Sequence, residues 1–442
     1  MFRFAQNDLI RWKDKPDRKP LIVRGARQVG KSFLISEFGK SHFDDVVEIN
    51  FERLPEHAEF FKERSPQKII QLIEAATDTT ITPGKTLLFL DEAQAVPQLF
   101  PTLRYFYEEM PGLHIIAAGS LLEFILSDHD FSMPVGRVEF LHLFPMTFEE
   151  FVLAKFDRKK LDYLHGISLS DTIPEALHRQ MLEALREYVL VGGMPIAVKT
   201  WIEQHSLAAC EEAKHNLLST VQSDFAKYRR RVPYERLVAC LRRLPALIGR
   251  KVKYVNIDEH DTAKNLSAAL DLLEMAQIIH RVFHTAAGGL PLGAERNHKI
   301  FKPLFLDVGL VSTLNGLNLT QLQDDLTLVN QGRISEQFVG QELLAGFAPY
   351  QKPEVYYWQR DKKNAAAEVD YVMNLENRII PIEVKSGKTG RLRSLGLFCK
   401  EKNISLALRF NSDKPSLVRG EYTLASLPLY LTGQWRRLLA SI

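Results

Sequence analysis

The residues best suited to chemistry form the segment GARQVGKS, at positions 25–32. Gly25 and Gly30 allow the backbone to curl around an anion, and Lys31 is long enough to reach the β and γ phosphates of a nucleotide. The hydroxyl of Ser32 is a suitable ligand for magnesium. The segment predicts a phosphate-binding loop for ATP and Mg²⁺. The nucleotide contacts expected from it are Gly25, Ala26, Arg27, Gln28, Val29, Gly30, Lys31, Ser32 and Phe33.

The residues on either side of this loop are those that a phosphate loop requires. Residues 21–23 are apolar and β-branched or leucine, which is typical of a buried parallel strand. Residues 33–40 have helical character, so the first amides of that helix would point at the phosphates. A chance glycine-rich turn is the alternative interpretation, and both flanks argue against it.

A second acidic segment follows another apolar run at residues 86–90. Asp91 and Glu92 would lie at the carboxyl end of that strand, where ligands of open α/β sheets bind. We expect Asp91 to hold magnesium together with Ser32, and Glu92 to polarise the attacking water as a general base. The alternative is an acidic pair that stabilises the start of a helix.

Two further residues are candidates for contacts with the γ phosphate. Residues 115–118 predict a third strand that leads to Ser120, a possible phosphate sensor, and residues 138–143 predict a fourth. Between these strands Arg137 follows Pro134, Val135 and Gly136 in a turn. An arginine there would suit the phosphate of a neighbouring subunit, as an arginine finger, or it is an ordinary turn arginine.

The C-terminal part returns to strand character and carries a second set of charged residues. Runs at 355–358, 368–373 and 379–385 predict strands, and Glu383 and Lys385 alternate on one face of the last of them. Two carboxylates, Asp370 and Glu383, would hold a metal against a scissile phosphate, while Lys385 would orient the water or stabilise the developing charge. Glu336 precedes them in a helical run at 334–344.

This set predicts a metal site made of Glu336, Asp370 and Glu383, with Asp370, Glu383 and Lys385 as the catalytic residues of a nuclease. The neighbours of these residues on the opposite faces are apolar, which favours a built site. Glu368 would replace Asp370 if the register differs. The ordinary alternative is that the charges form the solvated face of a strand.

Several motifs together resemble one family of proteins. They are GARQVGKS, LLFLDEAQ at 87–94, IIAAGS at 115–120, GRVEFLHLFPMTFEEF at 136–151, YVLVGGMP at 188–195, KPLFLDVGL at 302–310 and IEVKSG at 382–387. Their order resembles prokaryotic AAA+-type P-loop ATPases with a C-terminal domain of unknown function. The resemblance implies an α/β fold with three parts: an AAA+-like parallel-sheet domain at 1–160, a helical region with winged-helix character at 161–325, and a domain similar to PD-(D/E)xK restriction endonucleases at 326–442.

The middle region contains a concentrated run of basic residues. Between positions 225 and 254 Glu235 is the single acid. Helix, turn, helix and strand patterns follow one another here, and such a module can place a helix in the major groove of DNA. The basic run would cover phosphates, or it would pair with acids elsewhere. The basic residues are Lys227, Arg229, Arg230, Arg231, Arg236, Arg242, Arg243, Arg250, Lys251 and Lys253.

Composition limits the class of protein. The 442 residues are too many for one ordinary core, and a 45% apolar and 25% charged content is typical of globular chains. A net charge of +3 is too small to imply nucleic acid by itself. No apolar run reaches the ~20 residues of a membrane helix. We expect a cytoplasmic protein with no membrane partner and with reduced, buried cysteines at 210, 240 and 399.

The function predicted from these observations is Mg²⁺-dependent ATP binding and hydrolysis. The nucleotide state would position the nuclease-like C-terminal domain on DNA, through that domain and the basic run at 227–253. The alternative is a switch or scaffold that does not cleave nucleic acid and acts on a protein partner. A homo-oligomer is compatible with either function.

Overall fold

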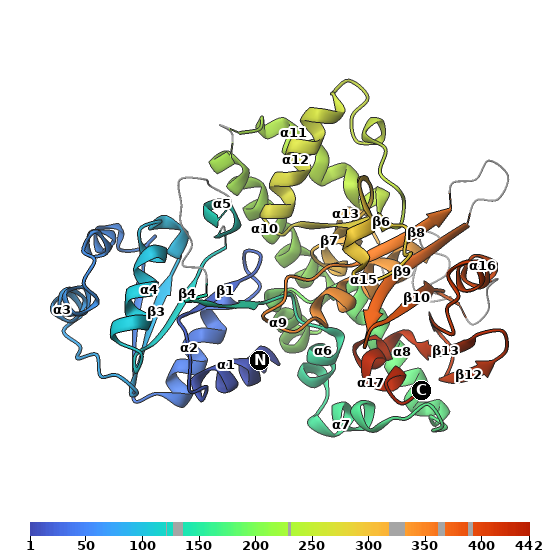
Figure 1. The fold of residues 1–442 in the computed structure, drawn as a ribbon, viewed down its shortest axis with the longest axis horizontal. Coiled ribbons are helices and arrows are strands. Elements are labelled where there is room, and N and C mark those ends of the chain that lie inside the picture. Colours follow the sequence, from blue (N-terminus) through green and yellow to red (C-terminus); the bar gives the residue numbers. More distant parts are fainter. Residues whose placement is uncertain (121, 127–135, 229–230, 318–331, 361–366, 388–391) are drawn as a thin grey trace. The chain divides into compact units, whose positions relative to one another are not determined.

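The structure is a computed structural model that describes residues 1–120, 122–126, 136–228, 231–317, 332–360, 367–387 and 392–442. The chain divides into two compact units (Figure 1). Unit 1 comprises Met1–Pro145, Met275–Gln277 and Phe347–Lys352, and unit 2 comprises Met146–Glu274, Ile278–Gly346 and Pro353–Ile442.

Unit 1 contains a five-stranded sheet in which every pairing is parallel. The strand order is β2-β3-β4-β1-β5. The strands are β1 (Leu21–Arg24), β2 (Asp45–Asn50), β3 (Thr86–Asp91), β4 (His114–Ala118) and β5 (Glu139–His142). The helices are α1 (Ala5–Lys13), α2 (Lys31–His42), α3 (Pro66–Thr77), α4 (Leu99–Glu109) and α5 (Leu122–Leu126), with 3₁₀ helices η1 (Pro55–Lys62) and η2 (Ala93–Ala95).

Helices cover the sheet on both faces, which explains why β3 and β4 are buried along their whole length. Apolar side chains of α3 and α4 pack with Leu88 and Leu90 in one core cluster, while α2 contacts β2, β3 and β4. The parallel α/β sheet and its strands expected near 21–23, 86–90, 115–118 and 138–143 are confirmed. The order puts the carboxyl end of β4 between those of β1 and β3, so the segments that follow these strands meet at one edge.

The first part of unit 2 is helical. Its helices are α6 (Phe148–Lys155), α7 (Arg158–Gly166), α8 (Glu175–Val191), α9 (Pro195–Gln204), α10 (Leu207–Asp224), α11 (Tyr234–Arg243) and α12 (Ala263–Met275), with 3₁₀ helices η3 (Phe225–Tyr228), η4 (Leu244–Leu247) and η5 (Tyr254–Asn256). Helices α8, α9 and α10 contact one another, and the later α13 (Val308–Leu314) contacts α8 and α10. The three cysteines are free and buried, as expected.

The second part of unit 2 contains a mixed eight-stranded sheet in the order β12-β13-β11-β10-β9-β8-β6-β7. The strands are β6 (Ile279–Thr285), β7 (Arg296–Phe305), β8 (Tyr356–Arg360), β9 (Ala367–Leu375), β10 (Arg378–Val384), β11 (Leu406–Asn411), β12 (Ser416–Arg419) and β13 (Thr423–Pro428). The remaining elements are η6 (Leu292–Glu295), α15 (Arg333–Ala345), α16 (Arg393–Lys402), η8 (Leu429–Gln434) and α17 (Trp435–Leu439).

Two strands that the sequence assigns to the middle region belong to this sheet. β6 and β7 form an antiparallel pair after α12, and β6 also pairs in parallel with β8 (Figure 1). The order helix, helix, strand, strand is therefore present, but its strands extend a larger sheet. The winged-helix interpretation and the three-part division at 1–160, 161–325 and 326–442 stay predictions. The boundary at 325 and 326 lies outside the described residues.

Two of the quoted motifs meet in the interior of unit 2. The carboxylate of Asp307 accepts hydrogen bonds from the backbone N–H of Gly193 at 2.6 Å and of Leu310 at 3.0 Å, so it joins the GGMP turn to the start of α13. The hydroxyl of Tyr188 donates to the carbonyl of Met146 at 2.5 Å. These motif residues are buried and hold elements together.

Candidate functional site

The loop between β1 and α2 contains two residues with a left-handed backbone. Gly30, directly before α2, has a φ of 92°, and Gln28 has a φ of 63°. A Cβ atom at Gly25 would lie 2.4 Å from the carbonyl oxygen of Leu143, so a side chain at this position would collide with backbone. Gly30 is therefore favoured by its positive φ, and Gly25 by the lack of space for a side chain.

Lys31 lies inside this loop. Its Nζ donates to the carbonyl oxygens of Gly25 and Ala26, each at 2.9 Å, and its exposed fraction is 7%. Burial lowers the pKa of Lys31 to about 8, although the nearby Glu92 and Asp91 oppose this shift. The loop thus holds an ammonium group that is short of counter-charge, and an anion seated in the loop would supply it.

Ser32 and Asp91 are adjacent across the carboxyl edge of the sheet. The hydroxyl of Ser32 donates to Asp91 at 3.1 Å from Oδ1 and 3.0 Å from Oδ2, and the Nδ2 of Asn50 donates to Oδ2 at 3.1 Å. Burial raises the pKa of Asp91, and the hydrogen bond from Ser32 opposes the shift. A hydroxyl and a carboxylate this close are the hard oxygen donors that Mg²⁺ prefers.

Glu92 directly follows Asp91 in a left-handed conformation, with a φ of 52°. Its Oε2 accepts a hydrogen bond of 2.5 Å from the Nε2 of Gln94. A Cβ atom on Gly119 would lie 2.0 Å from the Oε1 of Gln94. Glycine at position 119 therefore leaves the space that the Gln94 side chain occupies. Gln94 was not among the predicted site residues, although it is part of the LLFLDEAQ motif.

The two further residues predicted to contact a γ phosphate differ in environment. Ser120 is buried, and its Oγ has no hydrogen-bond partner among the described residues. Arg137 is 44% exposed at its side chain and forms an ion pair with Glu108, with 3.0 Å between Nε and Oε1. Pro134 and Val135 of the predicted turn lie outside the described residues. A role for Arg137 in a neighbouring subunit stays a prediction.

The remaining loop residues separate into a buried and an accessible group. Ala26 and Val29 are buried, Arg27 is half-buried, and Phe33 on the first turn of α2 is 57% exposed. The guanidinium of Arg3, which sequence reasoning missed, donates to the carbonyl of Val29 at 2.9 Å. This residue lies far upstream of the motif, and no local signal marks it.

The second predicted site is on the hairpin formed by β9 and β10. These strands pair antiparallel, as expected, with Tyr371 opposite Ile382. Asp370 accepts a 2.8 Å hydrogen bond from the backbone N–H of Val384, and Lys385 forms a 2.5 Å ion pair with Glu383. Burial raises the pKa of Glu383 to about 8, and the charge of Asp370 adds to the shift.

Glu336 reaches the same cluster from α15, and a residue that sequence reasoning missed lies among the acids. The Nζ of Lys302, on β7, is 3.7 Å from Oε2 of Glu336 and 3.9 Å from Oδ1 of Asp370, and it contacts Glu368 more closely. The structure thus gathers the predicted residues around a lysine. Within the described ranges no group of three His, Cys, Asp or Glu residues is arranged to hold a metal ion.

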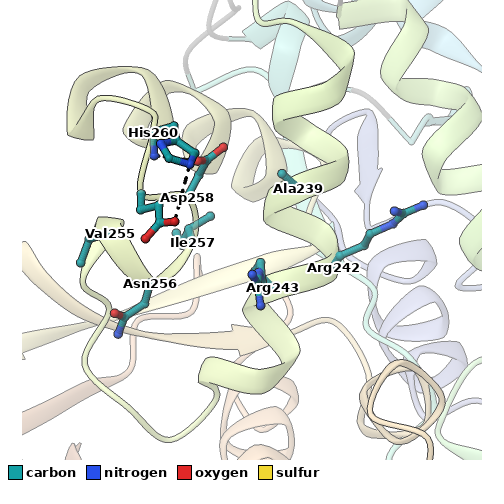
Figure 2. A pocket seen from close by; sticks show the side chains of 9 residues that line it. Ala239, Arg242, Arg243, Val255, Asn256, Ile257, Asp258 and His260 are labelled. Atoms are coloured by element: carbon teal, nitrogen blue, oxygen red, sulfur yellow. Dashed lines mark hydrogen bonds and ion pairs between the residues drawn. The ribbon is translucent and has the colours of Figure 1, made fainter.

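The basic run of the middle region lies partly around a pocket of about 470 Å³. Arg242 and Arg243 lie on α11 and Asp258 lies on the facing segment (Figure 2), and Glu259 also lines the pocket. Arg236 is paired with Asp261. Acids therefore offset part of the basic charge. Arg229, Arg230 and the side chain of Lys227 lie outside the described residues.

Comparison with known protein families assigns a domain type to the region that contains the loop at 25–32. Residues 17–152 match the family model of an AAA domain, while residues 182–321 and 331–428 match two domains of unknown function, DUF8612 and DUF4143. The chain therefore contains an AAA-type P-loop ATPase domain that holds the loop at 25–32, and a C-terminal domain of unknown function follows it, as the resemblance implied. No curated protein matches the chain.

Three solved structures are similar to parts of the chain. The Walker-type ATPase of Pyrococcus abyssi is 17% identical, covers 71% of this chain and 95% of its own, and has a TM-score of 0.43. The ORC2 protein of Aeropyrum pernix is 11% identical, with coverage of 71% and 94% and a TM-score of 0.33. VC1899 of Vibrio cholerae is 10% identical, with coverage of 95% and 97% and a TM-score of 0.17.

The described helices contain no stretch that is both apolar enough and long enough to cross a bilayer.

Proposed function

We propose that this protein binds ATP with magnesium at the loop of residues 25–32 and hydrolyses it. The observation that carries the proposal is the group of Lys31, Ser32 and Asp91 at the carboxyl edge of a parallel sheet. Loop amides and Lys31 would hold the phosphates, because burial of the ammonium outweighs the charges of Glu92 and Asp91 and an anion in the loop would offset it. Ser32 and Asp91 would hold magnesium, which supplies positive charge to the β and γ phosphates when bound.

Hydrolysis would be assisted by residues at the same edge. Glu92 is proposed to orient and deprotonate the attacking water, and the hydrogen bond from Gln94 would hold its carboxylate in place. Ser120 would contact the γ phosphate, since its buried hydroxyl finds no partner among the described residues. Arg137 is a further candidate for a phosphate contact in an assembly, where it would leave Glu108.

ATP binding is tested by calorimetric titration of the full chain with ATP and Mg²⁺. Lys31→Ala is expected to weaken binding at least about tenfold, since a charge-assisted contact to phosphate is lost. Lys40→Ala, on the same helix and exposed, is the matched control and should bind like the unaltered protein. Equal binding by Lys31→Ala would overturn the proposed site.

We further propose that the nucleotide state positions residues 326–442 as a nuclease-like domain on DNA. Support comes from the approach of Asp370, Glu383 and Lys385 on one hairpin, with Glu336 beside them. Residues 161–325 would link the two domains, with or without winged-helix character. Arg242, Arg243, Arg250 and Lys253 of the basic run are exposed and would contact phosphates without reading sequence.

The second candidate function is a nucleotide-dependent switch or scaffold that cleaves nothing and acts on a protein partner. The observation in its favour is Lys302, which is paired with the acids that the nuclease would use for metal. Cleavage of linear, circular and single-stranded DNA with Mg²⁺, with and without ATP, separates the two. Loss of cleavage in Asp370→Ala supports the nuclease, and no cleavage of any substrate beside ATP hydrolysis supports the switch.

A further inference from the structure

The acid cluster of unit 2 contains a buried lysine from a distant part of the chain. Lys302 lies on β7, and its exposed fraction is 3%. Its Nζ forms ion pairs with three carboxylates that come from two other elements, α15 and β9. The ammonium also lies 5.2 Å from the centre of the Tyr357 ring. These three carboxylates and this ring favour the presence of a positive charge.

The charges of the cluster divide into two sets. Lys385 pairs with Glu383 at 2.5 Å, and Lys302 pairs with the remaining acids. A buried carboxylate without a partner is costly, so each acid needs a nearby cation. Lys302 is the cation shared by Glu336, Glu368 and Asp370, and removing it would leave these three carboxylates to repel one another.

The place of this ammonium matters for the metal site predicted from the sequence. Glu336 and Asp370, two of the predicted ligands, face the same Nζ at 3.7 Å and 3.9 Å. A magnesium ion bound by both would need their oxygens at about 2.0–2.1 Å. An ion bound to these two oxygens would lie near the ammonium, because the ammonium is within 4 Å of both of them, and two neighbouring cations repel each other strongly in a buried site. The residues present therefore do not fit a divalent ion while Lys302 stays in place.

We propose that Lys302 is the resident cation of this cluster, and that its ammonium supplies beside Glu336, Glu368 and Asp370 the positive charge that a divalent ion would supply in a nuclease. The cluster then holds its three carboxylates together without metal. A divalent ion enters only when the ammonium is displaced. The proposal concerns the acid site of the proposed nuclease-like domain, but it does not depend on DNA cleavage or on ATP.

The raised pKa of Lys302 agrees with this geometry. Burial acts to lower the pKa of this lysine, and the charges of Glu336, Asp370 and Glu368 reverse the effect, so the group stays protonated at neutral pH. Glu383 has one buried oxygen, Oε2, without a hydrogen-bond partner among the described residues. That oxygen is available as a third ligand once the lysine is removed.

The test is a titration of the full chain with MnCl₂, without nucleotide, by calorimetry and by the electron paramagnetic resonance signal of free Mn²⁺. Lys302→Met keeps the length of the side chain and removes the charge. It is expected to bind one more Mn²⁺ than the unaltered protein, at least about tenfold more tightly than any site there. The additional site should disappear in the double variant Lys302→Met with Asp370→Asn. Lys299→Met, exposed on the same strand, is the matched control and should gain nothing.

Thermal unfolding gives a second measurement on the same proteins. Without metal, Lys302→Met is expected to melt below the unaltered protein, and Mn²⁺ should restore its melting temperature while leaving that of the unaltered protein unchanged. The proposal is overturned if Lys302→Met gains no Mn²⁺ site. It is also overturned if the unaltered protein binds Mn²⁺ at a site that Asp370→Asn removes, a result that needs no Lys302 variant to fold.

Discussion

Replacing Lys31 by methionine is predicted to stabilise unit 1 in the absence of nucleotide, although it removes the central cation of the phosphate loop. The ammonium is 7% exposed, and its contacts at 2.9 Å are neutral carbonyl oxygens of Gly25 and Ala26. Burial outweighs these contacts and lowers the pKa from 10.5 to about 8. The folded protein therefore holds this proton less tightly than the unfolded chain does.

The size of the effect follows from proton linkage. A fall in pKa from 10.5 to about 8 corresponds to about 3 kcal/mol of lost stability at pH 7. This loss of stability has its full size below pH 8, where the folded form must carry the charge. It disappears as the pH rises from 8 to 10.5. Methionine has similar length and no charge, so Lys31→Met should be more stable by up to about 3 kcal/mol at pH 7 and by little above pH 10.

Calorimetric melting at pH 7 and pH 10 measures this difference. In the unaltered protein the transition that ATP and Mg²⁺ move to higher temperature is assigned to unit 1. Lys31→Met should raise that transition at pH 7 and abolish its response to ATP. Lys40→Met, exposed on the same helix, is the control and should change neither. A lower transition for Lys31→Met at pH 7, or an equal difference at both pH values, would refute the reasoning.

Three further predictions concern other positions. Gly25→Ala should destabilise unit 1 by about 1–3 kcal/mol and weaken ATP binding, since the added Cβ would lie 2.4 Å from the carbonyl oxygen of Leu143. Thermal melting and ATP titration measure the two effects, and an unchanged melting temperature would contradict the prediction. Arg137→Ala should change the free energy of unfolding by less than about 1 kcal/mol, because its ion pair with Glu108 is exposed; urea unfolding tests this. Burial raises the pKa of Glu342 to about 8, so the unaltered protein should lose stability as the pH rises from 4.5 to 8. The free energy of unfolding of Glu342→Gln should exceed that of the unaltered protein by up to about 3 kcal/mol at pH 7. Equal stability of the two proteins at pH 7 would contradict this prediction.

The phosphate loop was predictable because its chemistry is contiguous in sequence. One short segment contains the glycines that shape the backbone and the two side chains proposed to contact the phosphates, and the apolar run of β1 precedes it. The partner carboxylate was predictable because Asp91 ends a strand that is buried on both faces. In both places the local pattern determines the local structure, so no long-range information was needed.

Other site residues were not predictable because strand order brings them together. Asn50 ends β2, and it reaches Asp91 only because β2 pairs with β3. Arg3 supports the loop from far upstream, and Gln94 finds its place beside Gly119, which β4 delivers. No spacing in the sequence encodes these contacts.

The acid cluster shows the same limit more clearly. Asp370 and Glu383 lie on consecutive strands and Lys385 directly follows the second, so their hairpin could be predicted from alternation. Lys302 comes from β7, which was assigned to the middle region, and it enters the cluster because β6 and β7 extend the C-terminal sheet. Whether these acids pair with an ammonium or bind a metal ion depends on that lysine.

ATP turnover by the full chain tests the central claim most directly. Phosphate release from ATP with Mg²⁺ is measured for the unaltered protein, Glu92→Gln and Lys31→Ala. The account predicts turnover by the unaltered protein, a loss of about 10²-fold to 10⁴-fold in Glu92→Gln with ATP still bound, and loss of both binding and turnover in Lys31→Ala. Undiminished turnover in either variant would contradict it.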